Sequence, residues 1–201
     1  MSDGAGKPPV VIASEQTSVT SGTDVQEKLI SASQVFSNLL KPTYGPRGLD
    51  KMLYKTDGNT AITNDGAKIV SELLVKHPAA KMLVSMCESQ EEACGDGVTT
   101  TMLLCGSLLQ EASTLLRKGL HPLTLVDGYR ASLSAAISQM DEDAQEASED
   151  RVVAVAETAL RGKGAEVALD LFSSLVVEAL TAVSSSGGEP RADKVSMFKS
   201  G

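Results

Sequence analysis

The sequence contains no tryptophan, and aromatic residues make up only 3% of its 201 positions, although hydrophobic residues reach 42%. A core can therefore form, but leucine, valine, isoleucine, alanine and methionine must build it. Small and straight-chain residues lose little rotamer freedom in a helix, so this composition favours helices. The length suffices for one sizeable domain or two small ones.

Histidine and cysteine are also scarce. Only two histidines are present, which excludes a histidine-rich metal centre. The three cysteines, Cys87, Cys94 and Cys105, are odd in number, and their spacing matches no common zinc or CxxC pattern. We therefore expect reduced and mostly buried thiols in a reducing compartment.

Positive charge is in short supply, because 18 basic residues face 26 acidic ones and the formal net charge is -8 at pH 7. An acidic chain repels phosphate backbones, so we expect no nucleic-acid partner. Residues 1–9 are polar and contain no apolar signal segment. Charges and glycines interrupt every apolar run before it reaches the length of a membrane span, so we expect a cytoplasmic protein with no membrane partner.

Apolar periodicity and turn signals predict a mainly helical chain with one small hairpin. Residues 1–22 are rich in Ser, Thr and Gly, which predicts a flexible arm with a short strand at 10–13. Helices are predicted over residues 24–41, 67–75, 78–94, 98–117, 122–140, 151–160 and 165–183. Strands are predicted at 51–55 and 61–63, around the turn 56–59, and at 194–198. The acidic stretch 141–150 is either a linker or an exposed helix end.

The helix predicted to begin at Pro78 follows a His-Pro pair, and proline is favoured in the first turn of a helix. Its apolar spacing predicts one buried face. The members of that face are Ala79, Met82, Leu83, Met86 and Cys87. Cys94 is followed by Gly95, and glycine is the usual residue at the C-terminal end of a helix, so the helix is expected to end there.

The segment most informative about function is the loop 95–97 and the helix start after it. The first N–H groups of a helix lack intrahelical partners and lie at the positive end of its dipole, so a phosphate fits there. Glycines let the backbone approach a ligand, Thr99 and Thr100 offer hydroxyl groups, and Asp96 suits magnesium, which prefers carboxylate and phosphate oxygens. On residue types alone, an ordinary turn with Asp96 or Thr99 as N-cap is the better interpretation.

Two further glycine-rich loops change that balance. They are TYGPRG at 43–48 and TNDGA at 63–67, and each precedes a separate structural element. Either one alone is best interpreted as a plain turn. Three such loops in this order and spacing favour a nucleotide site.

Several segments resemble those of group II chaperonins, the family of the thermosome and the eukaryotic cytosolic chaperonin. They are TYGPRGLDKML at 43–53, TNDGA at 63–67, HPAAKML at 77–83, GDGVTTT at 95–101, KGLHP at 118–122, DGYRAS at 127–132 and ALRGKGAE at 159–166. The TNDGA, HPAAK and GKGAE forms favour this class over the bacterial class. The resemblance extends from about residue 10 to the last residue.

The resemblance implies ATP and Mg²⁺ as cofactors and a role for each loop. Asp96 would hold the magnesium ion, and Asp65 would orient the attacking water, a role suited to phosphoryl transfer. The nucleotide-binding residues that it implies are Gly45, Pro46, Gly97, Val98, Thr99, Thr100, Gly162 and Lys163. Val98 stands where the family has threonine, so we expect weaker binding, through the backbone N–H alone. The alternative for Lys163 is a solvated loop cation.

The resemblance also implies the fold class, which is mainly α: a chaperonin equatorial-domain-like helical body with a small β-hairpin, plus the start of an α/β intermediate domain. Residues 1–22 would be a flexible N-terminal arm, and 23–147 the first half of the equatorial, ATP-binding domain. Residues 148–201 would be the first half of the intermediate domain, ending at the apical boundary. The hairpin and the N-terminal strand would pair with neighbouring subunits in a ring.

The function implied is ATP binding that assists ATP-dependent folding of unfolded client proteins within a ring of chaperonin subunits. A family member would continue beyond residue 201 into its apical domain and the returning halves of the other domains, which supply a second catalytic carboxylate. ATP hydrolysis by this chain alone therefore stays open. The chain is expected to be a fragment, one of two complementary chains, or a short variant that associates with itself.

A non-enzymatic helical interaction module that associates with chaperonin subunits is the alternative function. Without the returning halves, apolar helix faces would be left without partners, and such faces mark interaction surfaces. The face expected to be exposed consists of Leu103, Leu104, Leu108, Leu109, Leu115 and Leu116.

Overall fold

The computed structural model describes residues 21–54, 58, 60–184 and 192–198. These divide into two compact units. The first contains the described residues up to Thr43 together with Asp50–Leu120, and the second contains Tyr44–Leu49 and the described residues from His121 onward. The predicted arm and its strand at 10–13, and most of the hairpin turn, lie outside the described residues. The predicted domain boundary after residue 147 stays a prediction.

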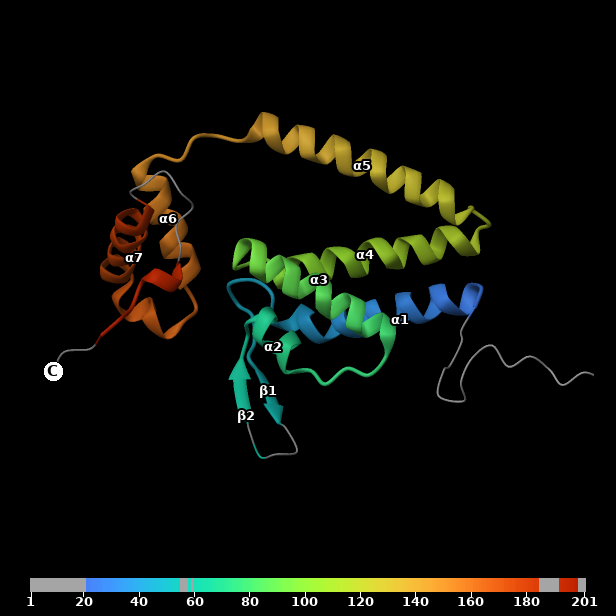
Figure 1. Ribbon diagram of the computed structural model, residues 1–201, viewed down its shortest axis with the longest axis horizontal. Helices are drawn as coiled ribbons and strands as arrows, with labels where there is room; N and C mark the ends of the chain where they lie inside the picture. Colours follow the sequence, from blue (N-terminus) through green and yellow to red (C-terminus); the bar gives the residue numbers. More distant parts are fainter. Residues whose placement is uncertain (1–20, 55–57, 59, 185–191, 199–201) are drawn as a thin grey trace, which may run out of the picture. The chain divides into compact units, whose positions relative to one another are not determined.

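The first unit is a helical layer with a two-stranded hairpin (Figure 1). Its elements are α1 (Thr23–Leu40), η1 (Lys41–Thr43), β1 (Lys51–Tyr54), β2 (Thr60–Thr63), α2 (Gly66–Glu72), α3 (Pro78–Cys94) and α4 (Val98–Arg117). The strands are antiparallel, with Lys51 opposite Thr63 and Tyr54 opposite Thr60. Helices α1, α3 and α4 pack against one another, and the hairpin extends away from them. The prediction of a mainly helical chain with one small hairpin is confirmed.

An aliphatic core holds this unit together. It consists of Phe36, Leu40, Ile69, Val70, Ala80, Leu83, Cys87, Val98 and Met102, which come from all four helices of the unit. Leu40, Ile69 and Met102 are completely buried. A single phenylalanine is the only aromatic member, as the composition predicts. Because Ile69 and Val98 lie near the first residues of α2 and α4, the core holds the starts of both helices.

Small residues let α1 and α4 approach closely. A Cβ atom at Gly106 of α4 would lie 1.9 Å from Oγ of Ser37 on α1. Two side chains of α1 hydrogen-bond the backbone of α4 at this crossing: Ser37 Oγ donates to the carbonyl of Met102 at 3.2 Å, and Gln34 Nε2 donates to the carbonyl of Gly106 at 2.7 Å. The crossing therefore joins the two helices by hydrogen bonds as well as by apolar contact.

The second unit is helical in its described part. Its elements are α5 (Pro122–Asp143), α6 (Glu149–Leu160), η2 (Gly164–Ala168), α7 (Leu169–Ser184) and η3 (Ala192–Lys194). Helices α6 and α7 pack together as a pair (Figure 1). The acidic stretch predicted as a linker or exposed helix end is exposed throughout, and α5 runs into it as far as Asp143.

Both histidines cap helices, which explains the His-Pro pattern. His77 Nδ1 accepts a hydrogen bond from the amide of Ala79, and His121 Nδ1 accepts one from the amide of Leu123, each at 3.2 Å. The intervening proline occupies the first helical position, where its missing N–H costs nothing. The two predicted helix starts are therefore confirmed.

The structure corrects three predictions about local structure. Met82 is 65% exposed, because the buried face of α3 is centred on Ala79, Ala80, Leu83 and Cys87, and neighbouring residues on a helix point about 100° apart. Residues 195–198 are not a strand, and no described strand lies beside them to complete a ladder. Helix α2 ends at Glu72, because Leu73 adopts an extended conformation.

The expectation that no segment has membrane-spanning length is also corrected. Among the described residues, Gly164–Ser184 is long and apolar enough by length and composition to cross a membrane, and 6% of its most apolar 18-residue stretch is buried. Its first part is the 3₁₀ turn η2, and α7 itself has 16 residues, which correspond to about 24 Å against about 30 Å of hydrocarbon. Glu166, Asp170 and Glu178 also lie within Gly164–Ser184. The feature is weak evidence for a membrane helix.

The cysteines are free thiols, but only two of them are shielded from solvent. Cys87 is buried in the core, Cys105 is half-buried and packs against the same core, and Cys94 is exposed at the end of α3. Burial, and secondarily the neighbouring Cys105 and Glu88, raises the pKa of Cys87 from 9.0 to about 11. Burial also raises the pKa of Cys105. The expectation of mostly buried thiols is therefore wrong for Cys94.

The Gly106→Ala substitution tests the helix crossing. The added methyl group would overlap Ser37, so we expect a loss of about 1–3 kcal/mol in the free energy of unfolding, measured by urea denaturation. Gly128→Ala in α5 is the matched control, because nothing lies within 4 Å of a Cβ atom there. Alanine favours helix over glycine by about 1 kcal/mol, so the control should be neutral or stabilising. Equal effects at both positions would contradict the close approach.

The thiols should differ in reactivity, because the thiolate is the nucleophile. At about pH 8 the folded protein should be alkylated by iodoacetamide at Cys94 first, and Cys87 should react only on unfolding, as measured by peptide mass spectrometry.

The raised pKa also means that Cys87 ionises at a lower pH in the unfolded chain than in the folded protein. The stability that burial of the neutral Cys87 thiol contributes is therefore complete below pH 9, and it is lost as the pH rises through about 11. Early alkylation of Cys87 in the folded state would contradict this burial.

Candidate functional site

The loop between α3 and α4 is built on two glycines in the left-handed region. Gly95 has φ of 66° and Gly97 has φ of 86°, on either side of Asp96. Residues with a Cβ atom rarely adopt this conformation, so glycine is strongly favoured at both positions. The amide of Gly95 donates to the carbonyl of Glu91 at 2.8 Å, which closes the last turn of α3 before the chain reverses into α4.

Helix α4 begins without a side-chain cap. Its N-cap residue is Gly97, and among the described residues no side chain accepts a hydrogen bond from its first turn. The first intrahelical bond runs from the amide of Thr101 to the carbonyl of Gly97, at 2.9 Å. The carboxylate of Asp96 turns instead to the amide of Gly97, where Oδ1 accepts at 2.7 Å. Neither Asp96 nor Thr99 therefore caps α4, contrary to the ordinary-turn interpretation.

The TNDGA loop begins α2 in a different manner. Asp65 is the N-cap of α2, and its Oδ1 accepts from the amide of Ala67 at 3.1 Å. The amide of Asp65 donates to Thr63 Oγ1, also at 3.1 Å. The side chain is exposed, so the carboxylate stays accessible to solvent while one oxygen caps the helix.

The two loops meet where α2 and α4 begin. Gly66 is buried, and a Cβ atom there would lie 2.1 Å from Oγ1 of Thr99 and 3.2 Å from its backbone nitrogen. Asp65, which directly precedes Gly66, therefore flanks the uncapped start of α4. The first unit thus brings together Asp65 and the loop that carries Asp96, Gly97 and Thr99.

The residues at the start of α4 face in different directions. Val98 is only 3% exposed and belongs to the core, so it can offer a ligand only its backbone amide. Thr99 is half-buried beside Gly66, whereas Thr100 and Asp96 are exposed. Valine at position 98 therefore adds apolar contact to the core in place of the hydroxyl group of threonine.

The other four predicted nucleotide-binding residues belong to the second unit. Gly45 has φ of 86°, and its carbonyl accepts from the amide of Gly48 at 2.9 Å, next to the exposed Pro46. Gly162 has φ of 74°, and its amide donates to Glu166 Oε2 at 3.0 Å. Lys163 is exposed directly before η2. The predicted roles of these residues stay predictions.

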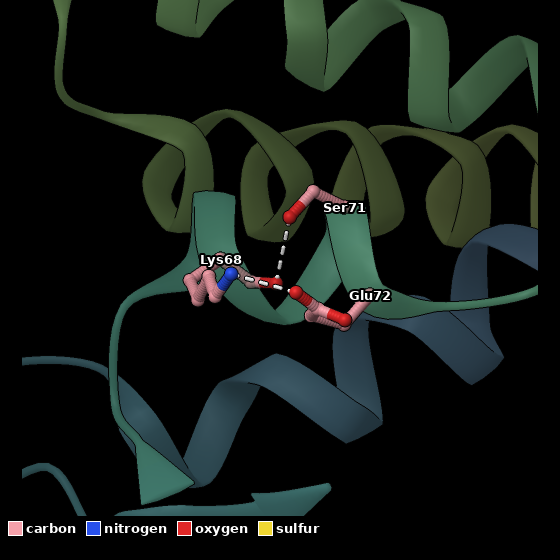
Figure 2. A network of polar contacts seen from close by, with 3 residues as sticks. All are labelled: Lys68, Ser71 and Glu72. Atoms are coloured by element: carbon pink, nitrogen blue, oxygen red, sulfur yellow. Dashed lines mark hydrogen bonds and ion pairs between the residues drawn. The ribbon is translucent and has the colours of Figure 1, made fainter. Parts of the chain in front are cut away.

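The nearest cation on α2 is occupied by an ion pair. Lys68 Nζ lies 2.6 Å from Glu72 Oε1, and Ser71 Oγ donates to the carbonyl of Lys68 at 2.9 Å (Figure 2). This pairing stabilises the short helix α2 by a few tenths of a kcal/mol, about 0.2–0.5. The carboxylates of Asp65 and Asp96 are exposed near the start of α4, so a bare polyphosphate would meet negative charge there.

This arrangement suits a divalent cation that is also bound by a phosphate better than a metal site made of protein ligands alone. Among the described residues, no group of three His, Cys, Asp or Glu side chains lies close enough to hold a metal ion. Magnesium commonly binds through one or two carboxylates, with phosphate oxygens and water as its other ligands. Asp96 beside an uncapped helix start therefore fits magnesium bound to a phosphate.

Sequence reasoning missed Gln90, on the last turns of α3. Its Nε2 donates to the carbonyl of Asp96 at 3.0 Å. The only sequence signal is a polar residue six positions before Asp96, and that spacing has no meaning until the chain reverses at Gly95. The contact is therefore a product of the turn at Gly95, which brings Asp96 back beside the last turns of α3.

Comparison with known proteins gives a consistent result. Residues 36–200 match the family model described as the TCP-1/cpn60 chaperonin family. The chain is similar to thermosome subunit alpha of Halobacterium salinarum, with 40% identity over 91% of this chain and 33% of the relative. It is also similar to thermosome subunit alpha of Archaeoglobus fulgidus, with 42% identity over 87% of this chain and 33% of the relative. The chain spans about a third of the length of the curated relatives it matches.

The Gly66→Ala substitution tests the contact between the two loops. The new methyl group would collide with Thr99 Oγ1, so we expect a loss of about 1–3 kcal/mol in the free energy of unfolding. Adding Thr99→Ala removes that oxygen and leaves the nearest atoms at 3.2 Å. The double variant should therefore be more stable than the sum of the single effects, as measured by urea denaturation in a double-mutant cycle. Strict additivity would contradict the contact.

Proposed function

This chain belongs to the TCP-1/cpn60 chaperonin family, and from that premise we propose that it binds ATP with Mg²⁺ at the start of α4 and serves ATP-dependent protein folding. The observation that carries the proposal is the close approach of Gly66 to Thr99. It supports a single site in which an exposed carboxylate from each loop flanks a helix start without a side-chain cap.

In this proposal the backbone of α4 holds the phosphates. The amides of Val98, Thr99 and Thr100 precede the first intrahelical bond and lie at the positive end of the helix dipole, which favours an anion. The left-handed Gly97 carries no side chain, so the ligand can come close to the backbone. The hydroxyl group of exposed Thr100 adds a further donor.

The two carboxylates have different tasks. Asp96 holds magnesium, which neutralises phosphate charge when bound. Asp65 accepts a hydrogen bond from a water molecule and orients it toward the terminal phosphate, while its Oδ1 stays on the amide of Ala67. That bond keeps the Asp65 side chain in a single orientation, which positioning of the water requires.

The remaining predicted residues complete the proposal. Gly45, Pro46, Gly162 and Lys163 are proposed as nucleotide-binding residues on the resemblance to the family alone, with Lys163 as a flexible point charge. The proposed assembly is a ring of chaperonin subunits in the cytoplasm, which acts on unfolded client proteins. The proposed domains are the equatorial half, 23–147, and the intermediate half, 148–201.

A second candidate function is a helical interaction module that associates with chaperonin subunits. It is favoured by exposed leucines on α4, since Leu104 is 59% and Leu115 is 37% exposed. Large exposed apolar side chains on one helix indicate a surface that another chain covers. The two candidates differ in one measurable property, because only the first requires nucleotide binding that depends on magnesium.

The Asp96→Asn substitution tests the nucleotide site. Asparagine keeps an oxygen that can accept from the amide of Gly97, so the loop should hold while the negative charge is lost. We expect affinity for ATP with magnesium to fall by about tenfold or more, as measured by isothermal titration calorimetry. Affinity for ATP without magnesium should be unchanged or higher, because a charge that repels phosphate is gone.

The matched control is Glu111→Gln, which removes one exposed carboxylate from α4 at a distance from the loop. Its affinity for ATP should equal that of the native protein with and without magnesium. If Asp96→Asn behaves as this control does, Asp96 does not bind the metal. If the native protein itself binds no ATP but associates with intact chaperonin subunits, the interaction module is the function.

A further inference from the structure

We propose that Gln90 is a positioning residue of the loop 95–97, the proposed phosphate-binding loop. Gln90 holds the peptide group between Asp96 and Gly97 in the orientation that nucleotide binding needs. The inference rests on the proposed ATP site and names a residue of α3 that contacts neither phosphate nor metal. Its evidence is a side-chain hydrogen bond together with the geometry of that one peptide group.

Both ends of the Asp96–Gly97 peptide group are held. Gln90 Nε2 donates to its oxygen, the carbonyl of Asp96, at 3.0 Å. Its N–H, on Gly97, donates to Asp96 Oδ1 at 2.7 Å. A peptide group is planar, so fixing its oxygen on one side also fixes its N–H on the other. By holding the carbonyl oxygen, Gln90 therefore also sets the direction of the Gly97 N–H that binds the carboxylate of Asp96.

The orientation of this peptide group also sets the direction of α4. The next rotatable bond is φ of Gly97, which has the left-handed value of 86°. A flip of the preceding peptide group would change that angle and redirect the first amides of the helix. Because α4 lacks a side-chain cap, Gln90 supplies from outside the helix the order that an N-cap side chain supplies elsewhere.

Gln90 also lies directly against Gly97. A Cβ atom on Gly97 would be 3.1 Å from Gln90 Nε2, so the carboxamide occupies the space that a side chain at position 97 would need. Gln90 is half-buried, on the same helix as the core residues Leu83 and Cys87.

The test compares two variants at Gln90 with a control elsewhere in the same unit. Gln90→Met keeps the length and the helix preference of the side chain but has no donor, and Gln90→Ala also removes the contact with Gly97. Gln34→Ala is the matched control, because Gln34 Nε2 also donates to a backbone carbonyl, that of Gly106 at 2.7 Å. All are made in the full chain.

Two quantities are measured. The first is hydrogen exchange of the Gly97 amide by NMR, without nucleotide, which reports on the N–H end of the peptide group whose oxygen Gln90 holds. Without the bond from Gln90 the peptide group can rotate, so the bond from the Gly97 N–H to Asp96 Oδ1 should open more often. Exchange should then rise roughly threefold to tenfold in both Gln90 variants and stay unchanged in Gln34→Ala. The second is the affinity for ATP, with and without magnesium, by calorimetry. It should fall by a similar factor under both conditions, whereas loss of a metal ligand weakens binding only with magnesium.

The outcomes separate this inference from the proposed function. If Gln90→Met exchanges the Gly97 amide and binds ATP as the native protein does, the inference is wrong even though the ATP site stands. If the native protein binds no ATP, the proposed function fails, and faster exchange in both Gln90 variants still supports Gln90 as the residue that orders the loop. Equal effects of Gln34→Ala and Gln90→Met on exchange would overturn the inference, because the effect would then be a general loss of stability.

Discussion

The contact between Gly66 and Thr99 is the constraint on which the candidate site depends. It brings the first residues of α2 and α4 so close that a Cβ atom on Gly66 would lie 2.1 Å from Thr99 Oγ1. Both helices are also held by the core, α2 through Ile69 and α4 through Val98. The relative position of the two loops is therefore a consequence of core packing. The same packing sets where the exposed carboxylates of Asp65 and Asp96 lie.

In the proposed site the two helix starts have different tasks, one in positioning and one in binding. Helix α2 has a side-chain cap from Asp65, which satisfies the amide of Ala67 and fixes the carboxylate. Helix α4 has glycine at its N-cap, so its amides are left for a ligand, and the order of its loop comes from Gln90 and Asp96. An anion site needs both properties, because unsatisfied donors attract the ligand and a rigid loop avoids the entropic cost of ordering on binding.

The exposed carboxylates explain why the proposed nucleotide site includes a metal ion. With exposed carboxylates at the site, and Lys68 paired to Glu72, the described residues of α2 and the loop supply little positive charge for a polyphosphate. A chaperonin-type chain with a net charge of -8 can nevertheless bind a nucleotide if the cation arrives with it. The exposed leucines of α4 are a separate feature of the first unit.

The sequence by itself determined the elements that local chemistry controls. It predicted both ends of α4 correctly, because Gly97 and Gly119 flank an uninterrupted helical pattern, and both His-Pro helix starts, because proline and the histidine cap act within one turn. It also predicted the β-hairpin and the family. Only the tertiary structure decided that Met82 is exposed and that residues 195–198 lack a strand partner, since burial and pairing depend on neighbours distant in the chain. The meeting of Gly66 with Thr99 belongs to the same class, because it exists only where packing brings separate segments together. The bond from Gln90 to Asp96 spans six residues, and it forms because the chain turns back at Gly95 and Gly97.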